Sequence, residues 1–303
     1  MRKKLIIALA LICTCLLFVS CSAESSGSNE ASEQTDKDVE DSSERIVATT
    51  VALVEIAEAL DLDLVGVPTT YKDLSERYND ATEVGLAMEP DMEIIQSLRP
   101  TDVLSVTSLK DDVGEYYEKT ETPVTYIDLE SIDGLLSSIE NLAETYDRES
   151  LAEELIADFD ERMQKVEEKV SGADQPSVLI LLGVPGSYLV ATEHSYLGDL
   201  VKRAGGQNVY ASSESDVEYT AVNTEHLQQT NPDIILRAAH GMPEEVVKMF
   251  DEEFKENDIW KHFDAVTNDE VYDLEETLFG TTANLAVIEA LEQLVDILHG
   301  TDD

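Results

Sequence analysis

Residues 93–103 (EIIQSLRPTDV) and residues 225–235 (EHLQQTNPDII) repeat one pattern, which indicates how the chain is organised. In both stretches a glutamate precedes a proline by seven residues, and a short apolar run typical of a strand follows the proline. The two glutamates lie 132 residues apart, as do the two prolines. A chance match of one glutamate and one proline would not reproduce this helix-to-strand context. The repeat therefore predicts a duplicated lobe.

Outward from the repeat, short apolar segments alternate with segments of helical periodicity. Strands are expected over residues 46–48, 64–67, 103–106, 126–128, 178–182 and 234–237. Helices are expected over residues 51–60, 91–98, 244–250 and 284–298. Strands that alternate with helices are typical of α/β proteins with largely parallel sheets.

The segment from residue 133 to 170 contains no proline and a single glycine, and its apolar residues recur at helical intervals. A helix of this length would extend for about 50 Å, and residues 147–150 are where it could be interrupted. A coiled coil would need a longer stripe. We therefore expect two Rossmann-like lobes, residues 45–132 and 171–303, joined by one long backbone helix over residues 133–170, with a ligand cleft between them.

The amino terminus is typical of an exported, lipid-anchored protein. Three cations at residues 2–4 precede an apolar run of about 15 residues, shorter than the roughly 20 needed to cross a bilayer, so residues 1–20 predict a signal peptide. The junction Phe18-Val19-Ser20-Cys21 resembles a bacterial lipobox, with Phe18 where leucine is usual. Residues 21–44 predict an acidic, flexible tether from a lipidated Cys21. An ordinary signal peptide cut nearby is the alternative.

The charge of the chain excludes one class of partner. Its 65 acidic and 20 basic residues give a formal net charge of −45, so no basic face is available for nucleic acid. A saline habitat would explain this acidity, because salt screens the repulsion between like charges.

The sequence contains no nucleophile elbow, zinc-protease motif or phosphate loop, and its histidines are not spaced as adjacent metal ligands. His240 differs from the other four because it follows a predicted buried strand, and ligand residues of α/β folds gather at the carboxyl ends of strands. Met88 lies in a loop before a predicted helix, an unusual place for a core methionine. Core packing is the alternative role for Met88. For His240 the alternative is a structural role.

Several segments carry a resemblance to a known family. They are residues 46–53 (IVATTVAL), 88–90 (MEP), 184–192 (VPGSYLVAT), 240–246 (HGMPEEV), 257–263 (NDIWKHF) and 271–276 (VYDLEE). The chain resembles the haem-receptor lipoproteins of the iron-regulated surface determinant (Isd) system. These proteins belong to the helical-backbone (class III) substrate-binding proteins of ABC importers for siderophores, haem and cobalamin. The resemblance covers residue 45 to the end of the chain.

The resemblance implies roles for particular residues. Met88 and His240 would be the axial ligands of the haem iron, one from each lobe. Thr49, Thr50, Thr70 and Tyr71 would lie in loops that hold the propionates, near the amino end of a helix that begins at about Val51. Glu93 and Glu225 would dock on arginines of the permease, although solvated helix faces would also explain them.

The expected function is therefore a haem receptor that catalyses nothing. It would be anchored through Cys21 to the outer face of the cytoplasmic membrane of a Gram-positive bacterium. It would carry haem b from cell-surface donor proteins to an ABC permease. A ferric-siderophore receptor of the same fold is the first alternative, although the single Trp260 and the few arginines offer little to hold an anionic chelate. An extracellular metallohydrolase built from His194, His240 and nearby carboxylates is the second.

Overall fold

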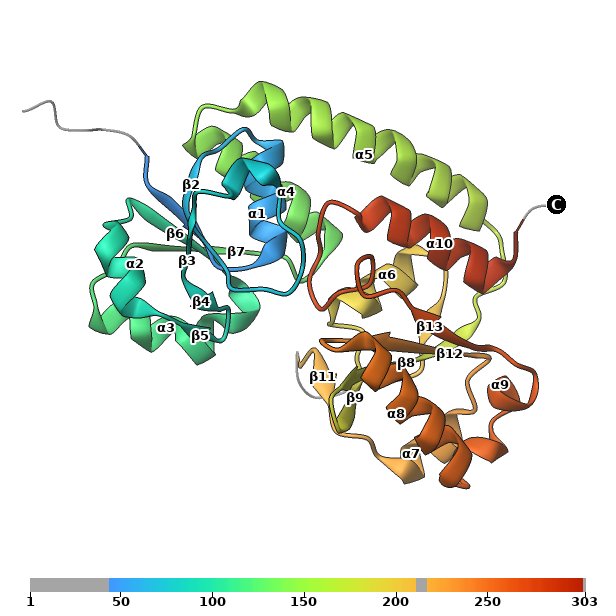
Figure 1. Cartoon of the computed structure of the whole chain (residues 1–303). Helices are drawn as coiled ribbons and strands as arrows, with labels where there is room; N and C mark the ends of the chain where they lie inside the picture. Colours follow the sequence, from blue (N-terminus) through green and yellow to red (C-terminus); the bar gives the residue numbers. More distant parts are fainter. Residues whose placement is uncertain (1–43, 211–216, 302–303) are drawn as a thin grey trace, which may run out of the picture. The chain divides into compact units, whose positions relative to one another are not determined.

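The computed structural model describes residues 44–210 and 217–301 (Figure 1). At residues 224, 225 and 228 it describes the backbone but not the side chains. The described residues belong to one compact unit. The predicted signal peptide, Cys21 and the tether up to residue 43 lie outside the described residues.

The first sheet has five parallel strands in the order β3-β2-β1-β6-β7. Its strands are β1 (Ile46–Ala48), β2 (Leu64–Val67), β3 (Thr82–Glu83), β6 (Asp102–Val106) and β7 (Val124–Ile127). Helices α1 (Val51–Ala59), α2 (Met92–Leu98) and α3 (Lys110–Lys119) connect them, and a small hairpin of β4 (Gly85–Leu86) and β5 (Glu89–Pro90) precedes α2. These elements are called the N lobe below.

The second sheet has six strands, with β11-β9-β8-β12-β13 in order and β10 paired to β8. Its strands are β8 (Ser177–Val184), β9 (Ser187–Ala191), β10 (Gln207–Asn208), β11 (Tyr219–Thr220), β12 (Ile234–Ala239) and β13 (Val271–Leu274). Its helices are α6 (Tyr196–Arg203), α7 (Thr224–Thr230), α8 (Pro243–Glu256), α9 (Asp264–Thr267) and α10 (Val287–His299). Strands β8, β12 and β13 are parallel, whereas β9 returns antiparallel to β8. These elements are called the C lobe.

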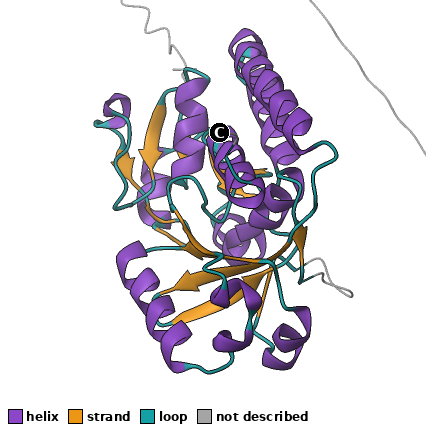
Figure 2. Cartoon of the chain, turned by 90° about the vertical axis from the view of Figure 1, so that its right-hand side faces the viewer, coloured by secondary structure: helices purple, strands orange, loops and turns teal. Residues whose placement is uncertain are grey.

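Alternate residues of the central strands face two apolar layers, as the period of a strand requires. In β8, Val178, Ile180 and Leu182 join the cluster that contains α6 and α10. Leu179 and Leu181 join a second cluster with residues of α8 and the buried Trp260. Figure 2 shows helices on both sides of this sheet. The near-continuous apolar sequence of the strand follows from this double burial.

Two helices, α4 (Ile132–Thr145) and α5 (Glu149–Val170), connect the lobes. They are separated at residues 146–148, where Asp147 has a φ of +55°. Helix α5 is tied to α10 by the Arg162 guanidinium, which contacts Glu289 at 2.8 Å and Glu292 at 3.0 Å. Lys169 and Asp296 form a further pair at 2.7 Å.

The internal repeat is confirmed element by element. Helices α2 and α7 each contain seven residues, begin after an Asx cap (Asp91 and Asn223) and end at a left-handed residue (Arg99 and Asn231) before proline. The strand that follows, β6 or β12, then lies next to β1 or β8 in the middle of its sheet. The two lobes therefore share one structural unit.

Candidate ligand-binding site

Met88 lies at the turn of the β4–β5 hairpin, and its side chain is 53% exposed. Leu86 on the same hairpin is equally exposed. The hairpin is tight: Gly85 has a φ of +95°, and a Cβ there would lie 2.7 Å from the Glu89 carbonyl oxygen. Only glycine takes this conformation without strain. The hairpin thus exposes two large apolar side chains to solvent, which excludes core packing as the role of Met88.

The loops after β1 and β2 contain the four residues expected near the propionates. Thr49 is buried, and its hydroxyl donates to the Leu104 carbonyl at 3.0 Å, so this hydroxyl is committed to the core. Thr50 caps α1 by accepting from the Leu53 amide at 3.3 Å. Thr70 accepts from the amide of Lys72 at 3.0 Å. Tyr71 extends outward, 68% exposed.

His240 follows β12 directly, as the sequence predicts. Its amide donates to the Gly183 carbonyl at 2.8 Å, which continues the β8–β12 ladder by one residue. The next two residues, Gly241 and Met242, have φ values of +74° and +48°, and Pro243 then begins α8. These left-handed residues turn the chain sharply, and Met242 is left 52% exposed. His240 is exposed and lies directly after the carboxyl end of β12.

The surroundings of His240 favour its neutral form. Although the imidazole is accessible to solvent, nearby protein removes part of its hydration, and this desolvation lowers the pKa of His240. Glu276 opposes the shift and Lys72 adds to it. A neutral imidazole is the form that coordinates a metal. The geometry therefore provides a ligand that is ready to bind at physiological pH.

A series of hydrogen bonds connects the Met88 hairpin to the His240 loop. The Thr69 amide donates to the Gly85 carbonyl at 2.8 Å, which joins the loop after β2 to the hairpin. Two residues later the Tyr71 hydroxyl donates to Glu276 Oε1 at 2.5 Å, and the same oxygen accepts from the Gly241 amide at 3.0 Å. The structure thus links the loops of Met88, Tyr71 and His240, which the sequence analysis grouped from distant positions.

The other predicted residues lie elsewhere. Glu93 is exposed on α2, and Glu225 occupies the equivalent position on α7, its side chain outside the described part. His194, which the metallohydrolase alternative names, lies 3.8 Å from Glu193. Across residues 44–210 and 217–301, no three His, Cys, Asp or Glu side chains form a group that could hold a metal ion.

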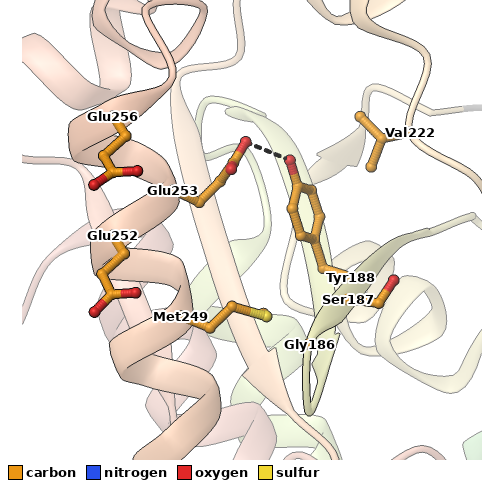
Figure 3. Close-up of a pocket in the computed structure, with 8 residues that line it drawn as sticks. All are labelled: Gly186, Ser187, Tyr188, Val222, Met249, Glu252, Glu253 and Glu256. Atoms are coloured by element: carbon orange, nitrogen blue, oxygen red, sulfur yellow. Dashed lines mark hydrogen bonds between the residues drawn. The ribbon is translucent and has the colours of Figure 1, made fainter.

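Two cavities in the described part of the chain lie away from these loops. One, of about 440 Å³, lies between the β8–β9 turn and α8 (Figure 3). Its Glu253 carboxylate accepts from Tyr188 at 2.9 Å, and also from Trp260 and Asn257. The other, of about 560 Å³, lies at the amino ends of β6 and β7. The Glu253 carboxylate of the first cavity is therefore already hydrogen-bonded within the C lobe.

Sequence reasoning missed four residues that the structure groups with the site: Leu86, Met242, Lys72 and Glu276. Lys72 follows Tyr71 directly, and a cation beside two threonines in so acidic a chain was the available signal. Glu276 lies two residues after β13, at the same sheet edge as His240. No strand was predicted over residues 271–274, so neither the position of Glu276 nor its partner Tyr71 followed from the sequence.

Comparisons with known proteins show the family to which the chain belongs. Residues 46–278 match the family described as "Periplasmic binding protein". The high-affinity heme uptake system protein IsdE of Staphylococcus aureus (strain Newman) is 47% identical over 290 residues, which cover 95% of this chain and 96% of that protein.

Solved structures give the same result. An ABC transporter substrate-binding protein from Listeria monocytogenes EGD-e has a TM-score of 0.80 and 53% identity, over 85% of this chain and 99% of that one. S. aureus IsdE complexed with heme has a TM-score of 0.80 and 50% identity, over 84% and 98%. The resemblance and the α/β fold expected from the sequence are confirmed. In the residues that the structure describes, no helix is long and apolar enough to cross a membrane. The chain belongs to the periplasmic binding protein family.

Proposed function

We propose that this protein is an extracellular haem receptor that delivers haem b to an ABC permease. The observation that carries the proposal is the hydrogen-bonded connection between the Met88 hairpin and the His240 loop. It connects the loop of an exposed thioether to the loop of an imidazole whose pKa is lowered by desolvation, and this supports a role for both side chains in one site. Thioether and imidazole together are a recognised axial pair for haem iron, and one that raises its reduction potential.

The apolar side chains around these two ligands suit a macrocycle. Six large apolar side chains are strongly exposed in the described residues, and four of them belong to these loops: Tyr71, Leu86, Met88 and Met242. In a chain with a net charge of −45, such a group of exposed apolar residues indicates a binding surface. A porphyrin ring would cover them.

The charged groups of haem need a different environment. Lys72 and the amino end of α1 are the positive features of the N-lobe loops, and α1 has no acidic residue in its first turn. Thr50 and Thr70 lie beside them. The buried hydroxyl of Thr49 already has a partner, so Thr49 would contribute through its backbone. We assign the propionates to this end of the site.

Titration of the purified protein with haemin tests the proposal. We expect a red-shifted Soret band that saturates at one haem per protein. A ferric-siderophore receptor would instead show fluorescence quenching by a siderophore and no Soret shift. Trp260 is fully buried and therefore cannot stack on a chelate, which makes this alternative the weaker one. A hydrolase would require bound zinc and ester hydrolysis; we propose binding and delivery without catalysis.

Delivery and anchoring form the second part of the proposal. Glu93 and Glu225 would dock on permease arginines, because the repeat presents them at matching positions of the two lobes. Replacing both by alanine should leave haem binding intact and reduce haem uptake by whole cells. Full uptake by this double variant would disprove docking.

Cys21→Ala should release the protein from the membrane fraction if Cys21 carries the lipid anchor.

A further inference from the structure

One carboxylate oxygen joins the two lobes next to the candidate iron ligand. Glu276 Oε1 accepts from the Tyr71 hydroxyl at 2.5 Å and from the Gly241 amide at 3.0 Å. The first donor belongs to the N-lobe loop after β2, and the second to the C-lobe loop after β12. Glu276 itself follows β13, which pairs with β12. The contact therefore spans the lobes at the position where His240 leaves its strand.

The backbone around His240 depends on this contact. The His240 amide is held by the Gly183 carbonyl at 2.8 Å, and the next amide, of Gly241, is held by Glu276. Two consecutive donors thus fix the peptide units on both sides of the His240 Cα. Beyond them the left-handed Gly241 and Met242 turn the chain into α8. Without Glu276, the second peptide would lose its acceptor and the loop one of its two anchors.

The Tyr71 hydroxyl remains protonated and can therefore donate a hydrogen bond. Desolvation and the hydrogen bond to Glu276 raise the pKa of Tyr71 to about 12, so the phenol stays neutral at physiological pH. The ring is nevertheless 68% exposed. A bond to a charged acceptor is stronger than one between neutral groups, but solvent weakens it here. The contact can therefore form and break without unfolding either lobe.

We propose that Glu276 is a positioning residue for His240 and that its bond to Tyr71 slows the release of haem. The inference rests on the proposed function, because it takes His240 as an iron ligand. Glu276 holds the ligand loop in one orientation, and Tyr71 holds that loop against the N lobe. Opening of the lobes for delivery would then break the Tyr71–Glu276 contact while the Gly241 contact persists.

The test is the rate at which haemin leaves the full-length protein for excess apomyoglobin. Tyr71→Phe removes only the hydroxyl and should accelerate release about fivefold, which corresponds to about 1 kcal/mol. Glu276→Ala removes both contacts and should accelerate release about tenfold or more. It should also change the reduction potential of bound haem, because His240 is no longer held. Glu276→Gln keeps an acceptor oxygen and should restore most of the wild-type potential. Matched controls are Glu275→Gln and Tyr116→Phe, an exposed tyrosine on α3.

The double variant separates this role from direct propionate contact. If Tyr71 acts through Glu276, then Tyr71→Phe adds nothing in the Glu276→Ala background. If the two substitutions instead had additive effects on the rate of haem release, the proposed role of the cross-lobe contact would be wrong. Wild-type release rates for both Tyr71→Phe and Glu276→Ala, with an unchanged reduction potential in Glu276→Ala, would overturn the whole inference. If the wild-type protein gives no Soret shift with haemin, the proposed haem-binding function is itself wrong. That result differs from one in which haem binds but the variants release it at the wild-type rate.

Discussion

The two lobes repeat one structural unit but use it differently. Helices α2 and α7 correspond in length, cap and left-handed end, and Glu93 and Glu225 occupy matching positions on them. The candidate iron ligands do not correspond. His240 follows the central strand β12, whereas Met88 lies on a hairpin before α2, a feature with no counterpart before α7 in the described residues.

This difference has a structural origin in the sheets. In the N lobe, β2 runs parallel to β1 and delivers the Tyr71 loop to the carboxyl edge. In the C lobe, β9 returns antiparallel to β8, so no equivalent loop reaches that edge from this strand. Helices α2 and α7 thus keep the repeat, which would suit the proposed docking on a permease with two similar halves. The candidate binding site does not follow this repeat. This suits a ligand that is contacted by a thioether on one face and by an imidazole on the other.

The largest effect is expected at the C-lobe ligand. His240→Ala should weaken haemin binding about a hundredfold, equivalent to about 2.7 kcal/mol, because it removes the nitrogen ligand. The Soret and Q bands should change as well. His262→Ala, at another exposed histidine, is the matched control. An unchanged spectrum and affinity in His240→Ala would remove the C lobe from the coordination of iron.

A smaller effect is expected at the N-lobe ligand. Met88→Leu keeps the apolar volume and removes only the sulfur, so affinity should fall about tenfold. The reduction potential of bound haem should fall too, because thioether ligation favours ferrous iron. Spectroelectrochemical titration measures this shift. The same potential in the variant as in the wild type would show that the lobes do not contribute different ligands.

Salt should stabilise both lobes to a modest extent. The net charge of −45 implies repulsion within and between them, and about 1 M salt shortens the screening length to about 3 Å. We expect the melting temperature to rise by about 3 °C between low salt and 1 M sodium chloride. Calorimetry at constant pH would measure it. A melting temperature independent of salt would argue against adaptation to a saline habitat.

The smallest effect concerns a carboxylate where the lobes approach. Desolvation, followed by repulsion from Glu130 and Asp128, raises the pKa of Glu218 to about 7. The folded state then holds this proton more tightly than the unfolded chain, so stability falls as pH rises from about 4.5 through about 7. Glu218→Gln should therefore be more stable than the wild type by about 1 kcal/mol at pH 8, with no difference below about pH 4.

Urea denaturation at several pH values would measure this difference. Glu154→Gln, at an exposed position of α5, is the control. The same pH dependence in the wild type and in Glu218→Gln would show that Glu218 ionises freely and that the lobes do not repel each other there.

Sequence periodicity was sufficient for the central strands and for the helices of the repeat. Strands β1, β2 and β12 begin at the predicted residues, because each is a buried apolar run with clear ends. Helix α3 was missed because its sequence, KDDVGEYYEK, is mostly polar and buries only Val113 and Tyr117. The short strands β3, β10 and β11 have two residues each, too few for any periodic pattern.

The candidate site could be predicted only in part, for a similar reason. His240 was recognisable because it follows a strand that the sequence identifies. The contact between Tyr71 and Glu276 joins residues 205 positions apart, and no local pattern contains that information. At Thr49 the resemblance implied a loop that holds the propionates, whereas the structure shows that Thr49 is buried and that its hydroxyl donates to the Leu104 carbonyl.

The apolar core has a consequence for how the protein unfolds. One continuous cluster contains residues of β1 and α1 in the N lobe, of α4 and α5, and of β8 and α10 in the C lobe. Neither lobe can lose its packing without exposing part of the other. Despite their two separate sheets, the lobes should therefore melt in a single cooperative transition, with equal calorimetric and van't Hoff enthalpies. Cooperativity of this kind would deny proteases a half-unfolded intermediate, which matters for a chain whose only cysteines lie in its first 21 residues.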